Sequence, residues 1–138
     1  MSALVCDTGP LVAVLNERDK YHDASVALFD EFNGDLVVPS LIVTEVCYLA
    51  QTQIGPHAET RFLDSIVEGE LIIEELTAAD WQRVAALAHQ YAGFPLGAAD
   101  ASVIAVAERL GVKRIASIDH RHMHAVRPVH CDGLELLP

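Results

Sequence analysis

Residues 3–10 read ALVCDTGP, a short apolar run that ends in an aspartate and a turn, and they give the first indication of the fold. The apolar run predicts a strand over residues 3–6. Pro10 suits the first turn of a helix, which we expect to continue to about residue 16. A strand, a turn and a helix in this order begin a βαβ unit. An acid directly after the strand then lies at the carboxyl end of a sheet, where open α/β proteins bind their ligands.

The same alternation of strand and helix patterns continues along the chain. Further strands are expected at 36–38, 71–73, 114–118 and 134–137, and further helices at 21–32, 40–53, 57–67, 77–91 and 97–110. Strands that alternate with helices predict an α/β fold with a mostly parallel sheet of about five strands. The length of 138 residues fits a single domain over residues 1–138.

Composition excludes several classes of protein. With 51% hydrophobic and 21% charged residues, the chain is not disordered. It has no apolar run of the roughly 18 residues that a membrane helix needs. The first residues lack the basic region and cleavage site of a secretory signal. Three cysteines without a Cys-x-x-Cys pair indicate buried thiols in a reducing compartment, so we expect a cytoplasmic protein.

Three carboxylates stand alone in long stretches without another Asp, Glu, Lys or Arg. Asp7 does so in residues 1–16, Glu45 in 36–58 and Asp100 in 84–107. Each is expected in or beside the core, where a lone charge costs several kcal/mol unless it is paired. Carboxylates brought together repel one another, and each raises the pKa of its neighbours unless a divalent cation lies between them. The sequence therefore predicts a metal site built from acidic side chains.

The predicted elements bring a fourth acid, Asp119, to the same place. Asp7 and Asp119 each follow a strand, and they face each other if the first and fourth strands flank the point where strand order reverses. Glu45 lies about two turns into its helix and Asp100 about one turn into its own, so both can point into the same crevice.

Ligands that are all oxygen favour Mg²⁺ or Mn²⁺ over zinc. Four carboxylates suit one such ion, or two ions about 3.5–4 Å apart, that activate a water and stabilise the leaving oxygen in phosphodiester hydrolysis. Such a site needs no catalytic Ser, Cys or His. The chain accordingly contains no Gly-x-Ser-x-Gly, phosphate-loop, Gly-x-Gly-x-x-Gly or His-Glu-x-x-His motif.

Structural alternatives exist for these acids and for the nearby histidines. Asp7 is also a good helix N-cap, Asp100 suits a first helical turn, and Asp119 fits a turn. Four histidines and a cysteine follow Asp119 without the spacing of a structural zinc site, so we expect surface residues: His120, His122, His124, His130 and Cys131.

The net charge of −11 is unusual for a protein that binds nucleic acid, which usually carries a basic face. Part of this charge is neutralised if the four acids bind metal. Basic residues gather near Asp119, and among them Arg121 and Arg127 are candidates to contact RNA phosphates. An acidic body also suits a basic protein partner.

Four short segments in this order resemble those of PIN-domain ribonucleases, specifically the VapC-type toxins of bacterial toxin–antitoxin pairs. The segments are 5–8, 39–45, 95–101 and 117–119, and the resemblance covers essentially the whole chain. It implies a three-layer α/β/α sandwich and a metal-dependent endoribonuclease that a cognate VapB-like antitoxin holds inactive. It also implies a homodimer, which forms a heterotetramer or larger assembly with the antitoxin.

The resemblance assigns roles residue by residue. The acidic quartet matches Asp7, Glu45, Asp100 and Asp119, and the hydroxyls that hydrogen-bond such acids match Thr8 and Ser117. Glu45 is the candidate to position or deprotonate the attacking water. Leu96 stands where some members of the family have a further carboxylate, so one or two metal ions are both compatible with the sequence.

Two other classes of protein remain as alternatives. A Mg²⁺-binding phospho-acceptor domain also gathers acids at strand ends, but it needs adjacent acids near the first strand and a lysine before the last. Residues 128–138 contain neither Lys nor Arg. A PIN-like module that binds RNA or protein without cleaving it would be indicated by the loss of an acid, yet all four positions are filled.

Overall fold

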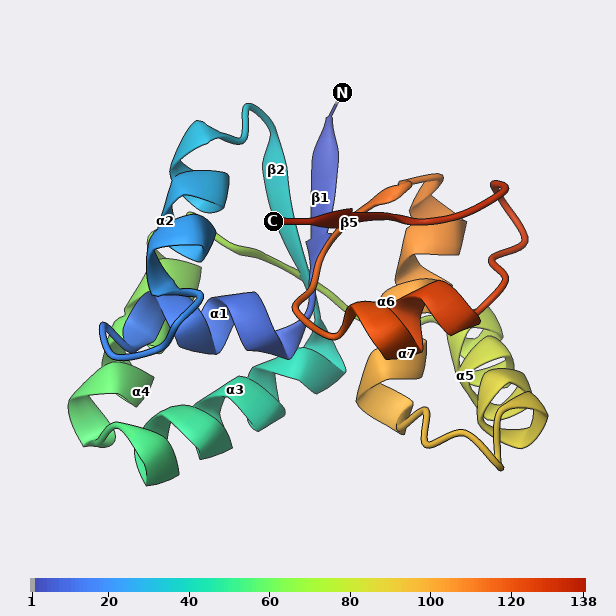
Figure 1. Cartoon of the computed structure of the whole chain (residues 1–138), viewed down its shortest axis with the longest axis horizontal. Coiled ribbons are helices and arrows are strands. Elements are labelled where there is room, and N and C mark those ends of the chain that lie inside the picture. The colour runs from blue at the N-terminus through green and yellow to red at the C-terminus, as the bar shows by residue number, and fades with distance from the viewer. Residues whose placement is uncertain (1) are drawn as a thin grey trace.

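The computed structural model describes residues 2–138, and a parallel sheet lies at its centre (Figure 1). The strands lie in the order β3-β2-β1-β4-β5, and every neighbouring pair is parallel. Their bounds are Ala3–Cys6 for β1, Asp35–Pro39 for β2, Ile72–Glu74 for β3, Arg114–Ala116 for β4 and Glu135–Leu137 for β5. This confirms the expected α/β fold, with a sheet that is parallel throughout.

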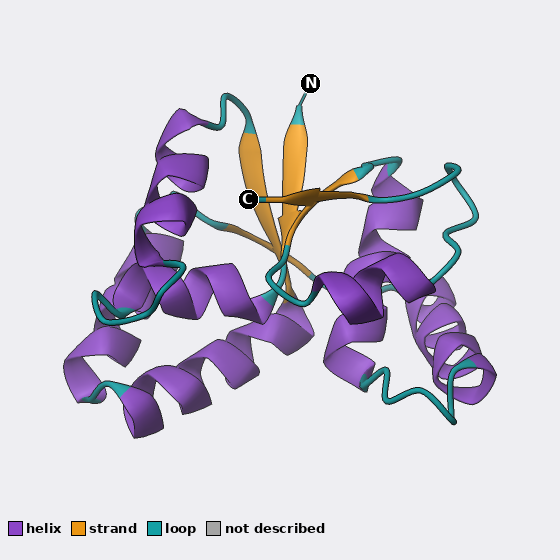
Figure 2. Ribbon diagram, viewed as in Figure 1, coloured by secondary structure: helices purple, strands orange, loops and turns teal. Residues whose placement is uncertain are grey.

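Helices cover both sides of the sheet and complete the three layers. Figure 2 shows α1 to α4 on one side of the strands and α5 to α7 on the other. Their bounds are Thr8–Leu15 for α1, His22–Glu31 for α2, Ser40–Gln53 for α3, Pro56–Val67 for α4, Ala78–Gln90 for α5, Ala98–Leu110 for α6 and His120–Ala125 for α7. Among the described residues, no helix is long and apolar enough to cross a membrane.

The core lies where β1 meets its neighbours and α6. Leu4, Val5 and Cys6 are fully buried because β1 is the middle strand, with Val5 opposite Val37 of β2 and Ile115 of β4. Every residue from 101 to 107 in α6 is buried as well. A helix that is apolar on all sides must be covered on all sides, which explains the long uncharged run around Asp100.

In the last third of the chain, one predicted strand was wrong in its bounds and one helix was not predicted. The fourth strand ends at Ala116, not at residue 118. Asp119 therefore does not follow the strand directly. It is the N-cap of α7, a helix that we did not predict. Only Met123 of this helix is buried, so the segment has no apolar periodicity that could have revealed it.

The remaining elements lie within about two residues of their predicted bounds. The capping box at the start of α5 is present, because the Thr77 side chain accepts from the Asp80 N–H and the Asp80 carboxylate accepts from the Thr77 N–H. Gly111 closes α6 in the left-handed conformation. Ser40 is the first residue of α3, whereas Pro39 occupies the cap position.

Candidate active site

Asp7 lies at the carboxyl end of β1, beside the point where the strand order reverses between β1 and β4. Its side chain is only 5% exposed. One carboxylate oxygen accepts a 2.9 Å hydrogen bond from the Thr8 N–H, and the other accepts a 3.0 Å bond from the Ser117 hydroxyl. Asp7 therefore caps α1, as the structural alternative had it, and it is also held in place by the neighbouring strand.

The two predicted supporting hydroxyls behave differently. Ser117 is buried and bridges two acids, because its hydroxyl donates to Asp7 and accepts a 3.1 Å bond from the backbone N–H of Asp119. Thr8 supports Asp7 through its backbone N–H rather than its hydroxyl. Among the described residues, the buried Thr8 hydroxyl has no hydrogen-bond partner. A buried hydroxyl next to Asp7 that lacks a partner suits a bound water or ion.

Asp119 is held by the helix that it caps. Its carboxylate accepts a 3.2 Å bond from the His122 N–H and lies 2.7 Å from the Nδ1 of the same residue. The His122 ring also packs on Phe94, with the centroids 4.7 Å apart. The expectation that His122 is a surface residue was therefore wrong, because α7 turns its ring back against Asp119.

Asp100 is half-buried in the first turn of α6. Burial is the largest cause of its raised pKa, followed by the negative charges of Asp119 and Glu45. The N–H of Gly97 and the charge of His122 act in the opposite direction. The charges of one acid on α3 and one acid in the loop after β4 therefore both raise the pKa of Asp100, as expected for groups that share one site.

Glu45 lies on an exposed position of α3, and the expectation of a place in or beside the core was wrong for this residue. The buried positions of this helix are Ile42, Val46 and Ala50, four residues apart on one face. Glu45 falls outside this face although its neighbours in sequence are apolar. Its charge nevertheless raises the pKa of Asp7 and of Asp100, so it belongs to the same cluster.

The electrostatics of the cluster are most visible at Asp7. Burial, and then the charge of Asp100, raise the pKa of Asp7 from 3.8 to about 7. The hydrogen bonds from Thr8 and Ser117 lower it but do not compensate. In the part of the chain that the structure describes, no Lys or Arg forms an ion pair with any of the four acids, and only Asp119 has a partner, His122.

The donor set fits a hard divalent cation, because it consists of carboxylate oxygens with the unpartnered Thr8 hydroxyl beside them. Between residues 2 and 138, no three acidic, histidine or cysteine side chains stand close enough to form a ready-made metal cage. An arrangement of this kind suits an ion that keeps several waters and takes only one or two carboxylates directly, as Mg²⁺ does.

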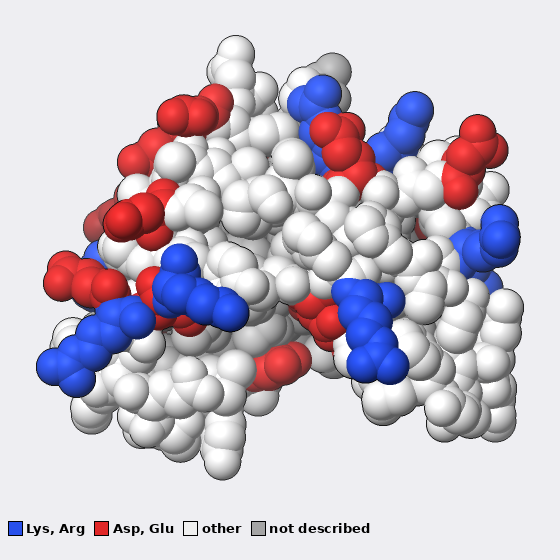
Figure 3. Space-filling model, viewed as in Figure 1, with Lys and Arg blue, Asp and Glu red and all other residues white. Residues whose placement is uncertain are grey.

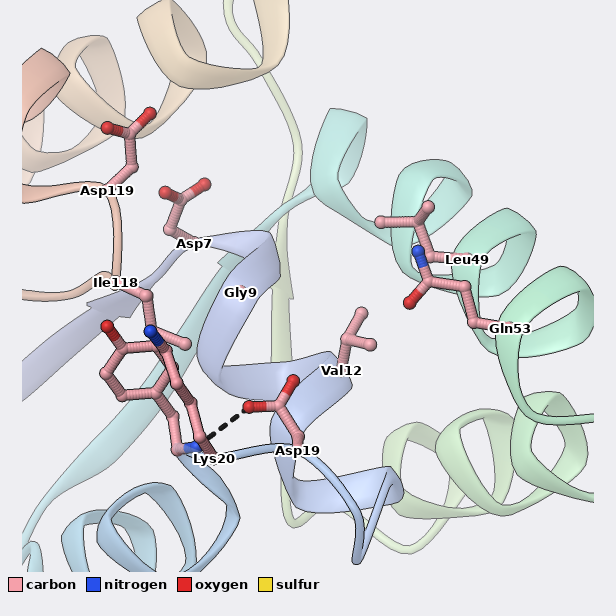
Figure 4. A pocket seen from close by; sticks show the side chains of 10 residues that line it. Asp7, Gly9, Val12, Asp19, Lys20, Leu49, Gln53, Ile118 and Asp119 are labelled. Carbon is pink, nitrogen blue, oxygen red and sulfur yellow. Dashed lines mark hydrogen bonds between the residues drawn. The ribbon is translucent and has the colours of Figure 1, made fainter.

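Two neighbouring cavities open beside Asp119, and Asp100 and Glu45 line neither of them. One, of about 500 Å³, is lined by Asp7 and Asp119 together with residues of α1, α3 and the loop before α2 (Figure 4). The other, of about 540 Å³, continues from Asp119 past Arg121. Both are lined by Tyr21, Ile118 and Asp119, and we call the two neighbouring cavities together the acidic groove.

The structure adds residues to the acidic groove that the sequence did not reveal. Asp19, Lys20, Tyr21 and Gln53 line it. Three of them come from the short polar connection between α1 and α2, whose composition is that of any surface loop. Of the two predicted arginines, Arg121 lines the groove, whereas Arg127 is exposed beyond α7 and does not line it.

Comparison with known proteins agrees with this geometry. A family model described as PIN domain matches residues 4–127. The chain belongs to the PIN-domain family. A curated relative, Ribonuclease VapC26 of Mycobacterium tuberculosis, is 28% identical over 135 residues, which covers 98% of this chain and 100% of the relative. The resemblance to VapC-type proteins is therefore confirmed, and the alternative of a phospho-acceptor domain is wrong.

Solved structures of other PIN-domain proteins share the fold. VapC20 of M. tuberculosis, described as a toxin that cleaves the sarcin–ricin loop, has a TM-score of 0.83 at 18% identity and covers 95% of this chain and 99% of its own. VapBC2 of Rickettsia felis, bound to a DNA fragment from its promoter, has a TM-score of 0.71 at 15% identity over 99% and 100% of the two chains. A toxin–antitoxin complex from Klebsiella pneumoniae has a TM-score of 0.70 at 16% identity over 89% and 92%.

Proposed function

We propose that this PIN-domain protein is the toxin of a toxin–antitoxin pair and that it hydrolyses RNA phosphodiester bonds with a divalent metal ion. One observation carries the proposal. At the carboxyl end of the sheet, the charges of neighbouring acids raise the pKa of Asp7 and of Asp100, and none of the four acids has an ion pair with Lys or Arg among the described residues. The curated relative, a ribonuclease that matches this chain over its whole length, points to RNA as the substrate.

Asp7, Asp100 and Asp119 are the residues that would hold the ion, directly or through its bound waters, with Glu45 nearby. A bound Mg²⁺ or Mn²⁺ supplies an activated water and stabilises the leaving oxygen. Ser117 orients this set, because its hydroxyl connects the carboxylate of Asp7 to the backbone of Asp119. Two carboxylates from different elements are thereby held in fixed positions, which a metal site requires.

Glu45 is suited to a different task from the buried acids. It is exposed on α3 and therefore stays hydrated, while its charge still acts on Asp7 and Asp100. We assign to it the positioning or deprotonation of the attacking water. A carboxylate that is in contact with solvent can pass on the proton that it accepts.

The partners follow from the relatives and from the charge. The solved complexes of K. pneumoniae and R. felis contain toxin–antitoxin pairs, so we assign a VapB-like antitoxin to this chain. A net charge of −11 and an acidic groove suit an antitoxin segment with basic side chains. The assembly that we propose is a homodimer that becomes a heterotetramer or larger with the antitoxin. RNA would reach the groove past Arg121, with Arg127 further out.

The test compares cleavage of total cellular RNA by antitoxin-free wild type, Asp7→Asn and a control variant, Asp64→Asn, on the exposed side of α4. Each protein is assayed with Mg²⁺, with Mn²⁺ and with EDTA. We expect metal-dependent cleavage by the wild type and the control, and none by Asp7→Asn. Cleavage that resists EDTA and is equal in all three proteins would contradict the proposal. A wild type that binds RNA and metal but leaves RNA intact would identify a module that does not cleave.

A further inference from the structure

A protein with a net charge of −11 needs particular cations to bring RNA to its carboxylates. Three of its nine Lys and Arg side chains are already engaged within the fold. Arg83, Arg109 and Arg114 form ion pairs with acids of this chain. Among the described residues, the Lys and Arg side chains that line the acidic groove are Lys20 and Arg121. The search for RNA contacts near the catalytic acids therefore narrows to these two.

Lys20 lies on the wall formed by the connection between α1 and α2. Its ammonium lies 5.0 Å from the centroid of the Tyr21 ring, a cation–π contact. The loop itself is fixed, because the backbone N–H of Tyr21 donates a 2.8 Å bond to the carboxylate of Asp19. In Figure 4 the Lys20 side chain extends along the wall toward Ile118. It has no ion pair in the part of the chain that the structure describes.

Arg121 has a matching position at the other end of the groove, in the first turn of α7. Its guanidinium carbon lies 5.9 Å from the centroid of the Phe94 ring. The Phe94 ring is in turn held against His122. Figure 3 shows basic side chains on both sides of a hollow, with acidic ones between them. Each cation is therefore preorganised on an aromatic ring, which reduces the side-chain entropy that binding would cost.

We propose that Lys20 and Arg121 form a phosphate clamp that holds the backbone of a single-stranded RNA segment on both sides of the catalytic carboxylates. The inference rests on the proposed RNA-cleaving function and names the positioning residues of the same site. The carboxylates repel the flanking phosphates, so cations at both ends of the groove set where the strand can lie. Tyr21 lines both cavities, and its ring contacts the Lys20 ammonium.

The first test measures binding without cleavage. All proteins carry Asp7→Asn, and the probe is a short, mixed-sequence, single-stranded RNA labelled with fluorescein. Lys20→Gln and Arg121→Gln are compared with Arg18→Gln and Lys113→Gln, whose exposed side chains line other cavities. We expect each clamp variant to weaken binding about tenfold and to lower the slope of log affinity against log salt by about 0.7, the value for one phosphate contact with a single strand. Lys20→Arg should retain the wild-type slope.

The second test separates positioning from folding in the otherwise wild-type enzyme. Lys20→Gln and Arg121→Gln should raise KM about tenfold with kcat within about twofold, since neither residue touches the reacting atoms. If all four Gln variants of the binding test weaken RNA binding equally, the cations act only as a diffuse positive field and the clamp is overturned. Clamp variants that bind like the parent would also overturn it. If the wild type fails to cleave while the binding pattern holds, the proposed function fails and the clamp stands as a binding site.

Discussion

Two regions of this protein bury acidic side chains, and only one of them pairs these side chains with arginine. Between α5 and α6, Asp80 and Glu108 have side chains that are 5% and 6% exposed, and each is paired with an arginine. Arg109 approaches Asp80 to 2.9 Å, and Arg83 binds both oxygens of Glu108 at 2.8 and 3.0 Å. In the acidic groove, Asp7 is as deeply buried but receives only neutral donors.

The acids that are paired with arginine stabilise the fold, whereas the acids of the cluster, which have no arginine partner, form a site that can accept a cation. A buried carboxylate with an arginine at bonding distance has its charge compensated within the fold. Asp7 has no such compensation, and the charge of Asp100 acts on it in addition, so its pKa rises to about 7. A fold that places arginines beside Asp80 and Glu108 but none beside Asp7 leaves room for a cation from solution.

The largest expected effect comes from neutralising an acid of the cluster, with an acid of the paired region as the control. Asp100→Asn should reduce metal-dependent RNA cleavage about a hundredfold or more, because it removes a proposed ligand. Glu74→Gln, on the paired side, should leave the specific activity within about twofold, since its contact with Arg109 is part of the fold alone. Initial rates on one RNA substrate, normalised to folded protein, check this. Equal losses in both variants would remove the distinction between the regions.

The stability of the metal-free protein should depend on pH through Asp7. Its pKa is about 7 in the folded state and near 3.8 in the unfolded chain, so the folded state retains a proton that the unfolded chain releases. The free energy of unfolding should therefore fall by about 3–4 kcal/mol as the pH rises from about 4 to 7 and then level off. Burial and neighbouring acids raise the pKa of Asp100 as well, which acts in the same direction.

Denaturant unfolding in EDTA at several pH values measures this slope. Asp7→Asn cannot release a proton at that position and should be the more stable protein at pH 8, with a flatter profile. Addition of Mn²⁺ should restore the stability of the wild type at pH 8, because the ion takes the place of the proton. Parallel profiles for the two proteins would show that Asp7 is not the group that titrates.

In the paired region between α5 and α6, Asp80→Asn should lower the free energy of unfolding and leave RNA cleavage unchanged. The change removes the charge that Arg109 contacts and weakens the capping box with Thr77, at a cost of about 2 kcal/mol. Cleavage per folded molecule should stay at the wild-type level. Thermal unfolding and activity measured on the same preparation decide the matter. A loss of activity without a loss of stability would place Asp80 in the catalytic machinery.

The smallest expected effect belongs to Ser117, which lies within the groove but carries no charge. Ser117→Ala removes the bond to Asp7 and the acceptor for the Asp119 N–H, at a cost of about 1 kcal/mol in stability. Activity should fall about tenfold, because the supporting bonds of ligands typically contribute that much. Ser117→Thr keeps the hydroxyl and is the matched control. Full activity in Ser117→Ala would show that Asp7 is positioned by the Thr8 N–H alone.

Local sequence patterns predicted the strand that ends before Asp7, the alternation that makes the sheet parallel and the buried run of α6. These features depend on local periodicity and turn residues, which any segment carries in its own composition. The isolation of Asp7 and Asp100 in uncharged stretches also identified two of the acids correctly as buried or half-buried. Order along the chain was enough to associate all four acids with one family.

Which groups share the acidic groove depends on tertiary packing and could not be predicted from the sequence. Glu45 is exposed because it lies outside the apolar face of α3. His122 is held against Asp119 by α7, a short helix that shows no apolar periodicity in the sequence. Lys20 lines the groove from a loop whose composition does not differ from that of an ordinary surface loop. Such placements depend on how distant elements pack, since packing determines desolvation and charge proximity, and no local window of residues encodes these.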